Sequence, residues 1–166
     1  MKSIRSRAPA ATSGLARRVM QANVGKTTAP ERQLRSALHW CGLRFRTNCC
    51  PSSRVKCKAD VVFTRSRVCV FVDGCFWHGC PTHFRPPRVN TEWWVEKIAD
   101  NVKRDADKTR ALEKEGWAVI RVWEHDIVAP PARLAAVVAR IRSVCIARGT
   151  VVRSSRKSMS IAPPLS

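Results

Sequence analysis

A loop near the middle of the chain contains two cysteines and a histidine at the spacing C-x4-C-x2-H. The three residues are Cys75, Cys80 and His83, and glycine and proline residues between them allow tight turns. Such a loop has few ways to fold if all three side chains bind one ion. A tetrahedral zinc site takes four ligands, usually Cys thiolates and His nitrogens. His125, at the end of a predicted strand, is the best candidate for the fourth, so we predict a structural zinc loop.

The other cysteines form no comparable pattern. The chain has eight cysteines, and no secretory signal pattern accompanies them, so a disulfide framework is not expected. A Cys75–Cys80 disulfide is the weaker alternative to the metal site. Cys49, Cys50 and Cys57 could form a second metal or redox cluster, but neither a histidine nor a spaced cysteine pair accompanies them.

Hydrophobic periodicity predicts the element order α-β-β-β-α-β-α. Thr28 and Glu31 form a capping-box pattern that begins a helix, and Gly42 ends it. The later elements are predicted at residues 43–46, 59–63, 68–72 and 117–122 for strands, and at 92–115 and 130–147 for helices. This order favours an α/β domain with a small mixed sheet flanked by helices.

The charge of the chain points to a polyanionic partner. There are 31 Lys and Arg residues against 12 Asp and Glu, a net charge of +19. Nucleic acid is the first candidate, because each neutralised phosphate releases counterions and adds affinity. A membrane surface is the rival polyanion. We expect no membrane binding, since no segment approaches the roughly 18 apolar residues of a membrane span and no helix pairs a Lys-rich face with a broad apolar one.

Much of this charge lies near the two ends. We predict a basic flexible arm over residues 1–15, a single domain over 16–147 and a basic flexible tail over 148–166, with no acidic residue in either end segment. An Arg- and Ser-rich transit peptide is the alternative interpretation of the first eighteen residues.

Three carboxylates could share one site. Asp60 interrupts an apolar strand, where an unpaired carboxylate is costly. Asp73 follows the next strand, so a hairpin could bring the two acids together. Glu31 begins the first helix and could reach the same place, although the capping box already explains it. Carboxylates on adjacent elements are suited to Mg²⁺, which supports phosphodiester hydrolysis. His78 lies outside the zinc spacing and is available for proton transfer or phosphate contact.

Taken together, these segments resemble a known enzyme family. The stretches DGCFWHGCPTHF, NTEWWVEKIADNVKRD and GWAVIRVWEHD, with TTAPERQLRSALHWCGLRFR and KADVVF upstream, are similar in order to the very-short-patch-repair (Vsr) DNA mismatch endonucleases. The resemblance covers roughly residues 16–128. It implies a restriction-endonuclease-like PD-(D/E)XK fold with a structural zinc loop. It also implies Mg²⁺-dependent nicking of one strand of double-stranded DNA at a T:G mismatch, the lesion left by deamination of 5-methylcytosine.

The resemblance also assigns roles to single residues. Asp60 matches the essential metal-binding acid, His78 the catalytic histidine and Glu31 the assisting acid of the first helix. His125 stands at a zinc-ligand position where some members have Cys, and Cys75, Cys80 and His83 match the other three. The aromatics that enter the DNA helix beside the mismatch correspond to Phe76, Trp77 and Trp94. Core packing is the alternative for Phe76 and Trp77.

One position departs from the family pattern. Some members have Thr-His where this chain has Val72-Asp73, and restriction-type enzymes usually have an acid-x-Lys there. Val72 can offer Mg²⁺ only its backbone carbonyl, and Asp73 would add an acid where the better-known sequences have a base. We therefore predict a rearranged Mg²⁺ site that contains Asp60, Val72 and Asp73.

The long helix is predicted to contact DNA through Lys97, Asn101 and Arg104, which recur at helical spacing. A solvated basic face is the alternative. We expect a monomeric cytoplasmic, nucleoid-associated enzyme, with mismatch-repair proteins as further candidate partners. The rival functions are a restriction-type endonuclease of the same fold and a non-catalytic, zinc-stabilised DNA-binding module.

Overall fold

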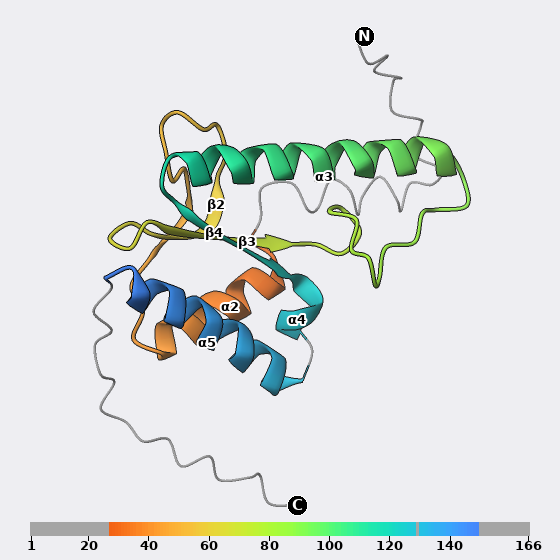
Figure 1. The fold of residues 1–166 in the computed structure, drawn as a ribbon. Coiled ribbons are helices and arrows are strands. Elements are labelled where there is room, and N and C mark those ends of the chain that lie inside the picture. The colour runs from red at the N-terminus through yellow and green to blue at the C-terminus, as the bar shows by residue number, and fades with distance from the viewer. Residues whose placement is uncertain (1–26, 129, 150–166) are drawn as a thin grey trace, which may run out of the picture.

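In the computed structural model, a four-stranded mixed sheet lies between two layers of helices (Figure 1). The structure describes residues 27–128 and 130–149. The strands, in sheet order, are β1 (Arg46–Cys49), β2 (Ala59–Phe63), β3 (Val68–Asp73) and β4 (Ala118–Trp123). The helices are α2 (Ala29–Trp40), α3 (Thr91–Lys114), α4 (Glu124–Val128) and α5 (Pro131–Ala147). The predicted element order is confirmed, and α4 is an additional short helix.

Helix α2 begins where the capping box predicted. The backbone N–H of Glu31 donates to the Thr28 hydroxyl, and the N–H of Thr28 donates to the Glu31 carboxylate at 3.2 Å. These bonds satisfy two N–H groups that have no partner within the helix. Leu34 and Leu38 are fully buried and fix the inner face of the helix. Glu31 is therefore part of a real cap, as the alternative interpretation held.

A hairpin connects β2 and β3. Val61 pairs with Val70, and Phe63 pairs with Val68, in antiparallel register. The predicted third strand is one residue too short, because Asp73 is still paired with Trp123 of β4. The prediction of a strand at residues 43–46 is wrong in its bounds. Pairing with β2 begins only at Arg46, and Leu43 is instead buried in the core.

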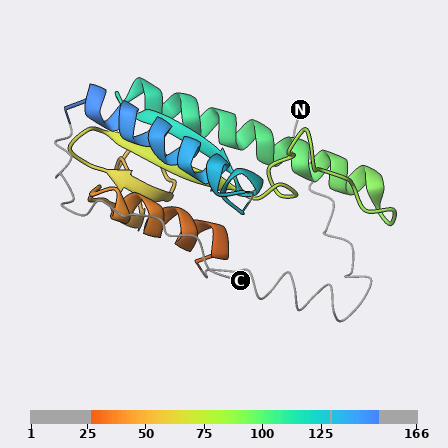
Figure 2. The ribbon, with the colours of Figure 1, turned by 90° about the horizontal axis from the view of Figure 1, so that it is seen from below.

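The helices are divided between the two faces of the sheet (Figures 1 and 2). Helix α3 covers one face, and α2, α4 and α5 cover the other. Because β3 and β4 are parallel, the chain must cross from one end of the sheet to the other, and α3 makes this crossover. The larger core lies on the α2 and α5 side and the smaller one on the α3 side, where Val62, Cys69, Leu112 and Trp117 are buried.

The N-terminal half of α3 extends past the sheet, and the loop that follows β3 lies against it (Figure 1). Gly79 shows how close this contact is. A Cβ atom there would lie 3.0 Å from Ile98 and 3.2 Å from Val102, and the φ angle of +64° also favours glycine. The loop is thus held between the end of β3 and α3.

The predicted arm at residues 1–15 and nearly all of the predicted tail at 148–166 lie outside the described residues. Within the described part, none of the helices combines the length and the apolar character that crossing a membrane needs.

Candidate active site and metal centre

The structure brings the four predicted zinc ligands together. The ligand atoms of Cys75, Cys80, His83 and His125 all lie within 4.8 Å of one another. Three of them come from the loop after β3. His125 comes from α4, the short helix that the sequence did not predict, directly after β4. The parallel pairing of β3 and β4 places both strand ends at the same edge, which is why a distant histidine reaches the loop.

The distances between these ligand atoms suit an ion with tetrahedral coordination. Nδ1 of His125 lies 3.1 Å from the Cys75 sulfur and 3.8 Å from the Cys80 sulfur, and Nδ1 of His83 lies 3.8 and 3.6 Å from the same two atoms. Zinc bond lengths at tetrahedral angles give an S···N separation of about 3.6 Å. Burial raises the pKa of the Cys75 thiol to about 11 in the absence of a cation. A bound cation would deprotonate it, so the set fits a metal.

Two further contacts support this loop. The backbone N–H of Cys75 donates to Glu124 at 2.7 Å, which ties the loop to α4. Nε2 of His125 lies 3.5 Å from the Asp126 carboxylate, a partner that can orient a ligating imidazole.

Asp60 lies at the centre of a second site. Its Oδ2 accepts a hydrogen bond from the backbone N–H of Val72 at 2.7 Å. Burial raises the pKa of Asp60 to about 6, and the nearby carboxylates of Glu31 and Asp73 act in the same direction. The Val72 hydrogen bond and the Arg35 charge oppose this rise. Among the described residues Asp60 forms no ion pair, so a bound cation would relieve a carboxylate that burial destabilises.

Glu31 reaches this region through Arg35. Its carboxylate pairs with Nη2 of Arg35 at 3.0 Å, and the same nitrogen donates to the backbone carbonyl of Asp60 at 3.1 Å. Arg35 also donates to Asn48 of β1. In this arrangement Glu31 holds α2 against the start of β2 and adds negative charge near Asp60.

His78 approaches the site from the other side. Its Nδ1 lies 2.5 Å from Oδ2 of Asp105, a residue of α3. Because a carboxylate can only accept, we assign a proton to Nδ1, and in the neutral ring Nε2 is then the nitrogen with a free lone pair. Asp73 is almost fully buried, and both of its oxygens accept from Arg121 at 2.6 Å. The predicted Mg²⁺ ligand Asp73 is therefore engaged in an ion pair.

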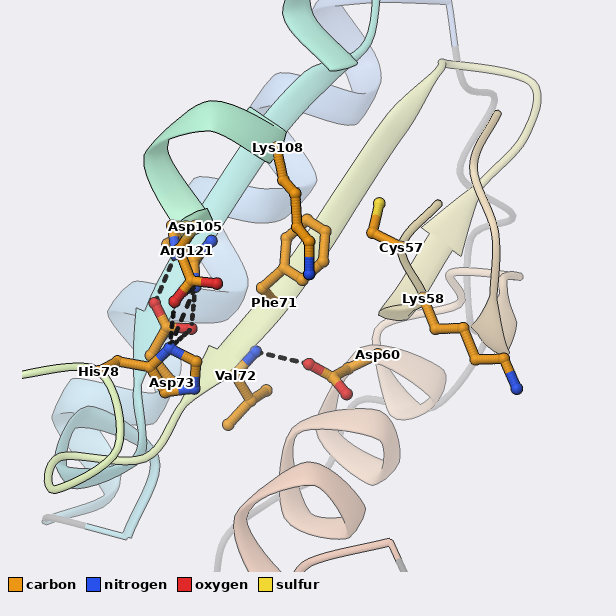
Figure 3. A pocket seen from close by; sticks show the side chains of 10 residues that line it. All are labelled: Cys57, Lys58, Asp60, Phe71, Val72, Asp73, His78, Asp105, Lys108 and Arg121. Carbon is orange, nitrogen blue, oxygen red and sulfur yellow. Dashed lines mark hydrogen bonds and ion pairs between the residues drawn. The ribbon is translucent and has the colours of Figure 1, made fainter. Parts of the chain in front are cut away.

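One pocket is lined by Asp60 and by the groups around His78, whereas Glu31 and Arg35 are not among its lining residues (Figure 3). In the close view Asp60 lies on one side of Val72, and His78, Asp73, Asp105 and Arg121 gather on the other. The remaining lining residues are Cys57, Lys58, Phe71 and Lys108. The sequence reasoning missed Asp105 and Arg121. A charged residue between Ile120 and Val122 was an available signal, the same signal that identified Asp60.

The predicted aromatic residues form a cluster beside the loop. Phe76 lies 5.2 Å, centroid to centroid, from both Trp77 and Trp94, and Trp77 and Trp94 lie 6.0 Å apart. Phe84 and Trp93 join the edges of the cluster. None of these residues belongs to the buried cores, and Trp77 is 37% exposed. Core packing therefore does not account for the exposed Trp77, whereas Phe76 is half-buried among its aromatic neighbours.

The three predicted DNA contacts on α3 differ from one another. Lys97 and Arg104 are exposed. Asn101 is buried, and its side-chain amide donates to the backbone carbonyl of Trp77 at 3.0 Å. Arg104 donates to the side-chain oxygen of Asn101. In this conformation Asn101 holds the aromatic loop on α3, and its amide does not point to solvent.

Comparisons with known proteins identify relatives of this chain. Residues 11–83 match the family model described as DNA mismatch endonuclease Vsr. The chain is 48% identical over 111 residues to the type II nicking enzyme V.NaeI of Lentzea aerocolonigenes, covering 66% of this chain and 67% of that protein. It is 37% identical to V.XorIIP of Xanthomonas oryzae, covering 77% and 90%, respectively. It is 38% identical to the DNA mismatch endonuclease Vsr of Escherichia coli, covering 63% and 66%.

Proposed function

This chain belongs to the Vsr family of DNA mismatch endonucleases, and we propose that it nicks one strand of duplex DNA at a T:G mismatch by Mg²⁺-dependent hydrolysis. The observation that carries the proposal is the pocket in which Asp60 and His78 flank Val72. One carboxylate without an ion-pair partner and one oriented imidazole suit hydrolysis of a phosphodiester. The relatives V.NaeI and V.XorIIP are named type II nicking enzymes, which supports cleavage of one strand.

Asp60 and the backbone carbonyl of Val72 are the proposed Mg²⁺ ligands. In a strand, the N–H and C=O of one residue point to the same side, and the Val72 N–H already points at Asp60. When bound, Mg²⁺ would neutralise the phosphate, lower the pKa of the attacking water and stabilise the leaving oxygen. Asp73, the third predicted ligand, is available only if its pair with Arg121 opens.

His78 is the proposed group for proton transfer. Asp105 fixes the ring through Nδ1, so the Nε2 lone pair is available to accept a proton from the attacking water or to contact the scissile phosphate through its protonated form. Glu31 is proposed to assist indirectly, because its charge acts on Asp60 and its pair with Arg35 holds the backbone of Asp60 in place.

The Cys/His cluster is proposed to hold structural Zn²⁺. Its donor set of two sulfurs and two imidazole nitrogens suits zinc, and nothing in it leaves an open position for a reactant. The cluster is close in sequence to both Phe76 and His78. We propose that zinc fixes the loop so that the aromatic side chains and the imidazole keep their relative positions.

The fold is proposed to be the restriction-endonuclease-like PD-(D/E)XK core. The support is the order α2, β1, β2, β3, α3, β4, with an antiparallel hairpin followed by a parallel crossover. Asp60 on β2 and the Val72–Asp73 pair at the end of β3 occupy adjacent strands, which is where this fold places its acidic motif.

Phe76, Trp77 and Trp94 are proposed to insert beside the mismatch. Separating stacked bases costs a few kcal/mol per step, and a flat ring can offset that cost. A T:G wobble pair deforms more easily than a normal pair, which turns deformability into selectivity. Lys97 and Arg104 are proposed to contact phosphates, since both are exposed on α3.

We expect Trp77→Ala to weaken binding of mismatched duplex by about 10–100-fold, because base–aromatic stacking contributes about 1–3 kcal/mol per base. Binding of matched duplex should change far less. Fluorescence anisotropy with T:G and T:A duplexes measures both. Trp40→Ala is the matched control, since Trp40 is 69% exposed on α2 and is not part of the aromatic cluster. An equal loss on both duplexes would contradict the wedge role.

The proposed activity is tested with a pool of labelled duplexes that carry T:G or T:A between randomised flanking bases. Denaturing and native gels after incubation with Mg²⁺ separate the possibilities. We expect a nick confined to the T strand of the mismatch. Double-strand cutting of the T:A pool would favour the restriction-type enzyme. Tight binding without cleavage, unchanged by Asp60→Ala, would leave the DNA-binding module.

A further inference from the structure

Arg121 occupies the middle of a charged network behind His78. Its Nε and Nη2 donate to the two oxygens of Asp73, each at 2.6 Å, in a bidentate pair. Nη2 also lies 3.2 Å from Oδ2 of Asp105 and 3.4 Å from Nδ1 of His78. The guanidinium carbon lies 5.3 Å from the ring centroid of Phe71, which limits its rotation. One arginine therefore contacts both carboxylates that face the imidazole.

The sheet register explains why this network forms. Arg121 of β4 is the parallel neighbour of Phe71, and Asp73 is two residues further along β3. Side chains two residues apart in a strand point to the same face, so Phe71, Asp73 and Arg121 all face α3, which supplies Asp105. The three charged groups thus come from three different elements that enclose one pocket wall (Figure 3).

The charges depend on one another. Asp73 is only 4% exposed and Asp105 is partly buried. Without Arg121, these two carboxylates would lose the cation that contacts both of them, which is unfavourable in a desolvated wall. Without Asp73, the guanidinium would lose its bidentate partner and its fixed orientation. When Arg121 and Asp73 are both replaced by neutral residues, neither charge is left behind without its partner.

We propose that Arg121 is a positioning residue for strand cleavage, which holds Asp105 at Nδ1 of His78, and that Asp73 serves as the anchor of Arg121. The inference rests on the proposed function of His78. It assigns Asp73 to the imidazole side of the pocket and leaves Asp60 and Val72 to the Mg²⁺ side. The chain would thereby use an internal ion pair at the position where restriction-type enzymes place their acid-x-Lys motif.

The test is a double-mutant cycle with Arg121→Gln, Asp73→Asn and the double variant, measured as kcat and KM for nicking of T:G duplex. We expect each single variant to lower kcat by about 10–100-fold with little change in KM, as groups that orient a reacting side chain do. The double variant should lose about as much as one single variant. Arg121→Lys, which keeps the charge but not the fork, should restore part of the rate.

Several controls separate this inference from its rivals. Arg54→Gln removes an exposed Arg–Glu pair outside the pocket and should leave kcat unchanged. Losses that multiply in the double variant would overturn the coupling. If added Mg²⁺ restored the nicking rate of Asp73→Asn, the result would instead identify Asp73 as a metal ligand. A fall in melting temperature or zinc content that accounts for the lost rate would make the pair merely structural.

A readout independent of cleavage keeps this test separate from the proposed function. The short His78–Asp105 hydrogen bond, at 2.5 Å, should give a downfield proton resonance in the NMR spectrum of the free protein, which His78→Ala removes. We expect Arg121→Gln and Asp73→Asn to weaken or abolish this resonance, and Arg54→Gln to leave it. An unchanged resonance in Arg121→Gln would overturn the positioning role, even if the wild-type protein nicks T:G duplex. Absence of nicking by the wild type would count only against the proposed function.

Discussion

Replacement of Asp60 by Asn is expected to lower nicking by at least about 10³-fold while binding of mismatched duplex is retained, because a catalytic metal contributes several kcal/mol of transition-state stabilisation. Asp60 is the pocket carboxylate without an ion-pair partner among the described residues, and its neighbour Val72 already donates to it. Single-turnover nicking and anisotropy give the two numbers. Asp107→Asn, an exposed carboxylate of α3, is the matched control and should retain the wild-type rate.

Both the nicking rate and the stability should depend on pH through the protonation of Asp60. Burial raises the pKa of Asp60 to about 6 from its ordinary value of 3.8. Protons should therefore compete with Mg²⁺ at Asp60, and nicking should fall as the pH is lowered through about 6. In the metal-free protein, the neutral form of Asp60 favours folding. Its contribution is fully present below about pH 3.8 and is lost as the pH rises through about 6.

Asp60→Asn should accordingly stabilise the protein in buffer that contains no Mg²⁺. We expect the free energy of unfolding to rise by roughly 1–2 kcal/mol near neutral pH, and this difference from wild type to shrink as the pH is lowered towards 4. Thermal or urea unfolding at several pH values measures it. A variant that nicks at the wild-type rate, or that is less stable than wild type at neutral pH, would contradict the assignment of Asp60.

Replacement of Cys80 by Ser is expected to remove the zinc and unfold the loop, with a loss of several kcal/mol of stability. Zinc binding contributes about 10–16 kcal/mol to the folding of small zinc domains, which is as much as the whole stability of an ordinary domain. Cys80 is 1% exposed and lies among the other three proposed ligands. Metal analysis and thermal unfolding measure the two consequences.

Two matched variants make the zinc prediction specific. Cys50→Ser changes an exposed cysteine outside the cluster and should keep both the zinc and the melting temperature. His125→Cys keeps four ligands and should retain zinc, in line with the Cys that some family members have at that position. A Cys80→Ser protein with full zinc content and unchanged melting temperature would refute the ligand assignment.

The local elements could be predicted from sequence because their signals are local. The capping box of Thr28 and Glu31 and the apolar runs at residues 59–63 and 68–72 are short-range patterns, and the structure confirms them. The bounds of β1 could not be predicted, because they depend on where the chain pairs with β2. Helix α4 is only five residues long, which is too short for helical periodicity to reveal it.

The candidate site divides in the same way. The sequence alone determined the ligand chemistry: the C-x4-C-x2-H spacing, an acid inside an apolar strand and a histidine between an aromatic pair and the second cysteine. Only the tertiary structure decided the partners of those groups. Parallel pairing of β3 with β4 placed Arg121 beside Asp73, and the crossover of α3 brought Asp105 to His78. Spacing along a chain fixes which neighbours share a turn, whereas an ion pair between elements depends on strand register and helix packing.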